Sequence, residues 1–500
     1  MVSRTTHLLY ILPFTVGTIA CQRVPSVRDE PSGGEPQLSI AARGDRDHDD
    51  RDDRDDDDRD RPVFLPRQPG ERTREQRPDR QLRDILRAID KDRLEATVRR
   101  LVAFGTRHTL SSQTDPQRGI GAATQWIYSQ FQNSAAASGG RMTVELQSFV
   151  QQPVPRVPAP TTITNVIATL RGTTSPDRIY VVSGHLDSRV TDPLNAEADA
   201  PGADDDASGV ALVLELARVM ARHPSDATIV FTAVAGEEQG LLGSAFQAAQ
   251  YRAANADIQG MFSNDIVGSS TADDGTRDPH TIRLFSEGVP TTETAAQGNI
   301  RRSTGGEVDG PSRQLARFAL MVAQNSDTDM QIRHIYRRDR FLRGSDHQSY
   351  LNQSYPANRF TEPNENFNHE HQDIRVENGV QIGDLIQFMD FKFLEGVTRV
   401  NAATIWSLAQ GPGTPKNLGI LTAALTNDTD LVWDANTEPD LDGYEVVWRE
   451  TTDSDWTHFI PVGNVTTAHL TKFSKDNVFF GVRAVDRAGH RSPVAFPAPR

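Results

Sequence analysis

The chain has 500 residues, a formal net charge of −15 and a hydrophobic share of only 37%. The length predicts two or three domains of about 150 residues each, and the low hydrophobic share predicts a sizeable non-globular portion. The negative charge argues against a nucleic-acid-binding protein, because such binding depends on cationic contacts with phosphate. The one cysteine, Cys21, excludes an internal disulfide.

Residues 1–21 have the pattern of an export signal. Arg4 precedes a short apolar stretch over residues 8–20, which ends in small residues directly before Cys21. The run Thr18-Ile19-Ala20-Cys21 resembles a bacterial lipoprotein processing site, in which the cysteine is lipidated. This resemblance implies an exported protein with a membrane attachment through Cys21, in the periplasm or at the cell surface. Ordinary secretion and an uncleaved anchor are the alternatives.

A hydrated linker is predicted over residues 22–80. The segment is rich in Pro, Gly, Arg and Asp, and nearly every residue from 45 to 61 is Asp or Arg. Without an apolar period it cannot bury enough surface to order itself, so we expect disorder.

Residues 81–410 show the alternation of helices and strands that is typical of an α/β domain. Apolar residues recur at helical spacing from Leu82 to Val102, and further helices are predicted over residues 122–131 and 208–222. Apolar runs of strand length occupy residues 165–170, 178–183, 227–235 and 258–263. This order predicts a mostly parallel mixed sheet covered by helices on both faces.

A second domain is predicted over residues 411–500. The run Gly411-Pro412-Gly413-Thr414-Pro415 is a linker signal, and short strand-like runs follow at residues 431–433, 444–449, 457–462 and 478–485. The pattern predicts an all-β sandwich and resembles a fibronectin type III domain. A spacer and a module that binds a polymer or a cell surface are both open roles.

Several chemically active side chains follow the predicted strands. His185 and Asp187 come after the strand at 178–183, Glu237 and Glu238 after the strand at 227–235, and Asp265 after the strand at 258–263. Ligands of open α/β sheets gather at the carboxyl ends of the strands. Asp187 is a candidate to hold the His185 imidazole, as carboxylates do beside many zinc ligands.

Two further places complete the candidate site. Asp204, Asp205 and Asp206 stand together at the start of a predicted helix, where one carboxylate suffices as a cap and three repel one another unless a cation compensates. His347 lies in a turn-like sequence. Imidazole and carboxylate donors in this combination suit two divalent cations, and zinc in particular.

The order and context of these motifs resemble the two-zinc exopeptidases of the secreted bacterial leucine aminopeptidase and glutamate carboxypeptidase type. The matching runs are residues 183–187, 202–209 and 237–244. The resemblance implies a zinc exopeptidase fold and two zinc ions per chain. It implies the following roles: His185 and Asp265 on one zinc, Glu238 and His347 on the other, Asp205 bridging, Glu237 as general base, and Asp187 orienting His185.

The run His369-Glu370-His371 lies in an Asn-rich segment and is interpreted as structural or pocket-lining rather than as a metal site. The leading hypothesis is an aminopeptidase that acts on peptides through a metal-activated water. A carboxypeptidase is the close alternative, because Arg338, Arg340 and Arg343 precede His347 and suit a substrate carboxylate. A non-catalytic surface receptor or adhesin is the alternative from another class.

Overall fold

The computed structural model describes residues 69–325 and 327–500. The predicted export signal, Cys21 and most of the predicted linker lie outside these residues, so export and lipidation stay predictions. No helix in the described part has both the length and the apolar character that a membrane span requires. Order begins before the predicted boundary at residue 80, because β1 (Glu71–Arg72) pairs with His458 and Phe459 of the C-terminal region.

An eight-stranded mixed sheet forms the centre of the N-terminal region. In spatial order its strands are β2 (Met142–Gln151), β3 (Thr161–Leu170), β5 (Ala227–Val234), β4 (Ser175–His185), β6 (Asp257–Asn264), β9 (Ala357–Thr361), β7 (Thr281–Phe285) and β8 (Gln331–Ile335). The central strands β5, β4, β6 and β9 run parallel to one another, whereas the pairs β2–β3, β3–β5 and β9–β7 are antiparallel. Every residue of β5 is buried, as a strand covered on both faces requires.

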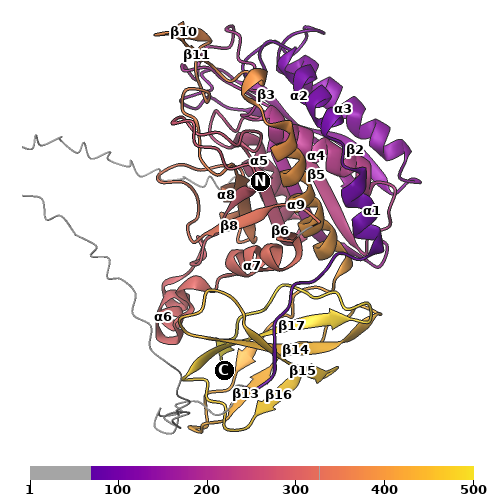
Figure 1. Ribbon diagram of the computed structural model, residues 1–500, viewed down its shortest axis with the longest axis vertical. Helices are drawn as coiled ribbons and strands as arrows, with labels where there is room; N and C mark the ends of the chain where they lie inside the picture. The colour runs from indigo at the N-terminus through magenta and orange to yellow at the C-terminus, as the bar shows by residue number, and fades with distance from the viewer. Residues whose placement is uncertain (1–68, 326) are drawn as a thin grey trace, which may run out of the picture. The chain divides into compact units, whose positions relative to one another are not determined.

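Helices cover both faces of this sheet (Figure 1). The helices of this region are α1 (Arg80–Ala88), α2 (Lys91–Val102), α3 (Ile120–Ala136), α4 (Ala207–Met220), α5 (Leu242–Ala253), α6 (Ala295–Thr304), α7 (Pro311–Ala323), α8 (His347–Leu351) and α9 (Phe391–Gln410). The region also has the 3₁₀ turns η1 (Gly306–Val308) and η2 (Ile386–Phe388) and a hairpin of β10 (Arg375–Glu377) and β11 (Val380–Ile382), and α6 lies apart from the sheet. Successive side chains of a strand point to opposite faces. Accordingly, Tyr180 and Val182 of β4 pack with α4 and α9, while Val181 packs with α5 and α8.

The single helical period predicted from Leu82 to Val102 is divided between α1 and α2. Asp90 stands between them, and its carboxylate accepts hydrogen bonds from the backbone N–H groups of Asp92 (2.9 Å) and Arg93 (3.4 Å). A side-chain cap of this kind starts a new helix.

The C-terminal region consists of two small sheets around its own core. One has the order β1-β15-β14-β17 and the other β16-β13-β12-β18, from β12 (Gly419–Ile420), β13 (Thr429–Val432), β14 (Leu441–Glu450), β15 (His458–Gly463), β16 (Thr467–Leu470), β17 (Val478–Asp486) and β18 (Ala498–Pro499). Trp433, Tyr444 and Trp448 lie in the core between them. The predicted fold class, an α/β domain with a helix-covered mixed sheet and a separate β-rich C-terminal region, is therefore confirmed. The resemblance to fibronectin type III stays a prediction.

A buried group of charges joins the two regions. Asp309, at the end of η1, accepts hydrogen bonds from Arg317 of α7 (2.6 Å) and from Arg449 of β14 (2.7 Å). All three side chains are almost completely buried. The C-terminal region is thus packed onto η1 and α7, which connect β7 and β8 of the sheet. A loosely tethered spacer would not require such a contact.

Candidate metal centre

The predicted ligands meet at one edge of the sheet because of the strand order. His185 ends β4, Glu237 and Glu238 follow β5, and Asp265 follows β6. β4 lies between β5 and β6 and is parallel to both, so the carboxyl ends of the three strands share an edge. Asp205 reaches the same edge from the segment that leads into α4.

The first group of ligand atoms comes from His185, Asp205 and Asp265, which are all buried. Nε2 of His185 lies 2.9 Å from Oδ1 of Asp205 and 3.7 Å from Oδ1 of Asp265. Nδ1 of His185 lies 3.1 Å from the backbone carbonyl of Asp187. A carbonyl only accepts, so Nδ1 carries a proton, and Nε2 is the ring nitrogen that faces the group.

The second group comes from Asp205, Glu238 and His371. Nε2 of His371 lies 2.8 Å from Oδ2 of Asp205 and 3.0 Å from Oε1 of Glu238. Asp205 therefore belongs to both groups, one oxygen facing each. Burial disfavours the ionised form of Asp205, but the charges of His371 and His185 outweigh burial and hold the pKa of this carboxyl well below its usual value.

The structure does not bring His347 to this centre, and the assignment of this histidine as a ligand is corrected. His347 begins α8, is completely buried, and its Nε2 lies 2.9 Å from the backbone carbonyl of Arg338. His371 takes its place. It lies in a loop with no preceding strand, where the rule of strand ends gives no signal, and its backbone is left-handed at φ 53°. The one sequence signal was the run of residues 369–371, which we interpreted as pocket-lining.

The neighbours of Asp205 have supporting roles. Asp206 caps α4 by accepting from the backbone N–H of Gly209 (2.8 Å), and its other oxygen accepts from the backbone N–H of His185 (2.8 Å). Asp204 accepts from the backbone N–H of Gly268 (2.7 Å). Only the middle carboxylate of the three is left to face the metal centre.

Asp187 contacts the residues that follow β5 as well as His185. Its carboxylate lies 3.8 Å from Nδ1 of His185, beyond a hydrogen bond, and the backbone carbonyl makes that contact instead. The carboxylate accepts from the backbone N–H groups of Glu237 (3.2 Å) and Glu238 (3.1 Å). Asp187 is thus a positioning residue that connects the ends of β4 and β5.

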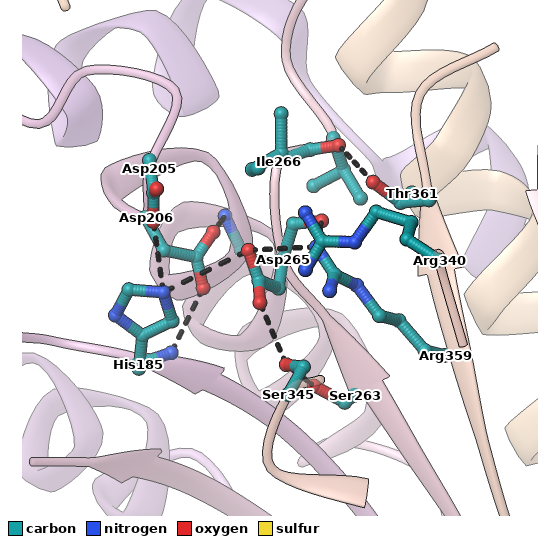
Figure 2. Close-up of polar contacts among 12 residues, drawn as sticks. His185, Asp205, Asp206, Ser263, Asp265, Ile266, Arg340, Ser345, Arg359 and Thr361 are labelled. Atoms are coloured by element: carbon teal, nitrogen blue, oxygen red, sulfur yellow. Dashed lines mark hydrogen bonds and ion pairs between the residues drawn. The ribbon is translucent and has the colours of Figure 1, made fainter. Parts of the chain in front are cut away.

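Asp265 is held from the side opposite His185 (Figure 2). The hydroxyl of Ser345 donates to its carboxylate at 2.6 Å, and the buried guanidinium of Arg359 lies 3.1 Å from its other oxygen. These contacts fix the carboxylate, and Oδ1, the oxygen that contacts Arg359, also lies 3.7 Å from Nε2 of His185. Charge-assisted contacts of this kind commonly orient metal ligands.

Glu237 borders a cavity of about 470 Å³ that also exposes Asp205, Glu238, Asp265 and His371. Its side chain is half-buried, as is that of His371, whereas Asp205, Glu238 and Asp265 are buried. Burial among the site residues raises the pKa of the Glu237 carboxyl well above its usual value; His185 opposes this effect and Asp265 adds to it. A carboxylate with a raised pKa beside metal ligands is suited to accept a proton.

The arginines considered for a substrate carboxylate separate into two classes. Arg340 and Arg343 line the cavity, whereas Arg338 does not and instead donates to the side chain of Asn352. Arg340 lies 3.2 Å from Asp339 and 3.3 Å from Glu365, and Arg343 is paired with Glu365 as well.

The residues present fit zinc. The two groups offer imidazole nitrogens and carboxylate oxygens, which are the usual zinc donors besides thiolates. Oδ1 of Asp205 and Oε1 of Glu238 are buried and accept no hydrogen bond of good geometry among the described residues, although an imidazole nitrogen lies 2.9 Å from the first and 3.0 Å from the second. Buried carboxylate oxygens are costly without a partner, and a cation between the ligands would supply one.

Comparison with known proteins gives the family. Residues 165–378 match Peptidase family M28. A protein of Pyrenophora teres f. teres named "Probable zinc metalloprotease" is 52% identical over 426 residues, which are 85% of this chain and 88% of that protein. The chain belongs to peptidase family M28.

Two further proteins are similar to this chain. A "Probable zinc metalloprotease" of Pyricularia oryzae is 51% identical to the M28 peptidase described here, over 86% of this chain and 87% of the relative. Among solved structures, LapB of Legionella pneumophila is similar at a TM-score of 0.47 and 18% identity, covering 68% of this chain and 78% of its own. The protein is a zinc metallopeptidase, and its substrates are peptides.

Proposed function

We propose that this M28 peptidase holds two zinc ions per chain and removes amino-terminal residues from peptides. The observation that carries the proposal is the shared position of Asp205, which contributes to both groups of ligand atoms. His185 and Asp265 would hold one ion with Asp205, and Glu238 and His371 would hold the other with Asp205. Zinc bound there polarises the scissile carbonyl and makes a water more acidic.

The protein's own residues supply the proton transfers. Glu237 lines the cavity beside both groups, accepts a proton from the attacking water and delivers it to the leaving nitrogen. Asp187 supports this role, because its carboxylate accepts from the backbone N–H groups of Glu237 and Glu238. Asp265 is held by Ser345 and Arg359, so the first ligand group keeps its geometry during the reaction.

Two properties of the cavity favour action at the end of a peptide. A cavity of about 470 Å³ is in the range of small-ligand sites. Carboxylates on its wall, among them Glu237 and Glu238, attract a protonated amino terminus. A carboxypeptidase is the second candidate, because Arg340 and Arg343 line the same cavity.

A panel of peptides tests the proposal. With zinc restored, the purified protein should hydrolyse leucyl-arylamide and short peptides with a free amino terminus, and acetylation of that terminus should reduce kcat/KM at least about tenfold because the attraction between ammonium and carboxylates is lost. Preference for amino-blocked peptides with a free carboxyl end would favour the carboxypeptidase. Absence of hydrolysis together with absence of bound zinc would contradict the enzyme and favour a surface receptor.

The assignment of His371 in place of His347 gives a separate prediction. We expect His371→Gln to bind close to one zinc ion per chain, because the second group loses its imidazole. His347→Gln should keep close to two, because this side chain contacts the carbonyl of Arg338 and no ligand. Elemental analysis after dialysis measures both, and circular dichroism controls for folding. Two ions in His371→Gln and one in His347→Gln would reverse the assignment.

A further inference from the structure

Four guanidinium groups border the metal cavity of this acidic chain. They belong to Arg156, Arg189, Arg340 and Arg343. The four arginines differ in whether a carboxylate of the protein neutralises their positive charge.

Three of the four have carboxylate partners. Nε of Arg189 lies 2.7 Å from Oε2 of Glu238, and its Nη2 lies 2.7 Å from Nδ1 of His371, so this arginine holds the second ligand group. Arg340 and Arg343 are paired with Glu365. The positive charges of these three arginines are therefore neutralised by carboxylates of the protein itself.

Arg156 differs from the other three. Its Nη1 donates to the backbone carbonyl of Glu238 at 2.7 Å. Across the described residues no carboxylate lies within ion-pair distance of Arg156, and the side chain is exposed. The Arg156 guanidinium thus lines the cavity without a carboxylate partner among residues 69–325 and 327–500.

The backbone holds Arg156 in place. Val154 and Val157 exchange two backbone hydrogen bonds of 2.9 Å each, which close a tight turn with Pro155 and Arg156 at its tip. Val157 is completely buried and anchors the turn, and Pro155 restricts its backbone. A guanidinium presented on such a turn loses little freedom when it binds an anion.

We infer that Arg156 binds a carboxylate of the substrate on the leaving-group side of the scissile bond. This inference rests on the proposed function and specifies its substrate class: short peptides with a free carboxyl terminus, or an acidic side chain, just after the bond that is cut. A guanidinium repels a protonated amino terminus, and its planar fork matches a carboxylate. Arg156 therefore recognises the opposite end of the substrate from the end that the cavity carboxylates attract.

Two pairs of substrates separate the two sources of the carboxylate. Leu-Gly is compared with Leu-Gly-amide for the carboxyl terminus, and Leu-Asp-amide with Leu-Asn-amide for the side chain. Leucine is chosen for the first residue because Leu241 and Leu342 line the cavity. The variants are Arg156→Ala, Arg156→Lys and the control Arg171→Ala, which removes an exposed arginine that does not line the cavity.

In the wild type we expect the charged member of at least one pair to have the higher kcat/KM. In Arg156→Ala the ratio of kcat/KM for the charged peptide to kcat/KM for its uncharged counterpart should fall about tenfold. The change should arise mainly in KM, because a charge-assisted hydrogen bond to the substrate is lost. Arg156→Lys should keep part of the wild-type ratio, and the control Arg171→Ala should keep all of it. Calorimetric binding of the same pairs to Glu237→Gln, with and without Arg156→Ala, should change in parallel.

The inference would be overturned if the wild type hydrolyses all four peptides and Arg156→Ala leaves the two kcat/KM ratios unchanged. The proposed function would stand in that case. A wild type that holds zinc and hydrolyses none of them, nor any amino-blocked peptide, would overturn the proposed function. The pair that responds identifies the source of the carboxylate.

Discussion

Glu237→Gln should lower kcat by about 10²–10⁴-fold, the usual contribution of a general base. Glutamine has nearly the same shape and keeps the backbone N–H that donates to Asp187 at 3.2 Å. It cannot accept a proton from water at neutral pH. The residue lines the cavity and is absent from both ligand groups, so we expect the bound zinc to be retained.

Steady-state kinetics on leucyl-arylamide measure this effect, together with elemental analysis of the same preparation. Glu145→Gln is a suitable control, because Glu145 is an exposed glutamate on β2. Activity within about tenfold of the wild type in Glu237→Gln would remove this residue from the proton transfer. Loss of zinc together with activity would instead place it among the ligands.

Asp309→Asn should lower the free energy of unfolding by about 3–5 kcal/mol, the cost of breaking a buried ion pair by removing one partner. The Asp309 carboxylate is completely buried between Arg317 and Arg449, which are themselves almost inaccessible. Asparagine would fill the space but remove the carboxylate that both buried guanidinium groups share, and leave Arg317 with only the more distant Asp455 at 3.9 Å. The effect is large because water cannot replace the lost partner.

Denaturant unfolding followed by tryptophan fluorescence measures this change. The control is Glu307→Gln, an exposed substitution two residues away that should change stability by less than about 0.5 kcal/mol. Arg449→Met should also destabilise, because it removes a partner from the C-terminal side of the same contact. Equal stability of Asp309→Asn and Glu307→Gln would show that the two regions are held together by other contacts.

The predicted strands and helices correspond closely to observed ones where the apolar pattern is strong. The run at 227–235 predicts a buried strand, and β5 occupies Ala227–Val234 at the centre of the sheet. The run at 208–222 predicts a helix, and α4 spans Ala207–Met220. β7, β8 and β9 have five residues each and were not predicted, because so short a segment carries too little periodicity.

The sequence by itself determined the α/β class and the meeting of His185, Asp205, Glu238 and Asp265, because ligands placed directly after parallel strands share one edge of a sheet. Only the tertiary structure decided between His347 and His371. His371 lies in a loop and His347 begins the five-residue helix α8, and neither place has a strong local sequence pattern. The position of a loop depends on distant contacts such as that of Arg189 with His371. The same reason applies to Asp187, whose carboxylate contacts the end of another strand, and to Asp309, whose partners lie in two regions of the chain.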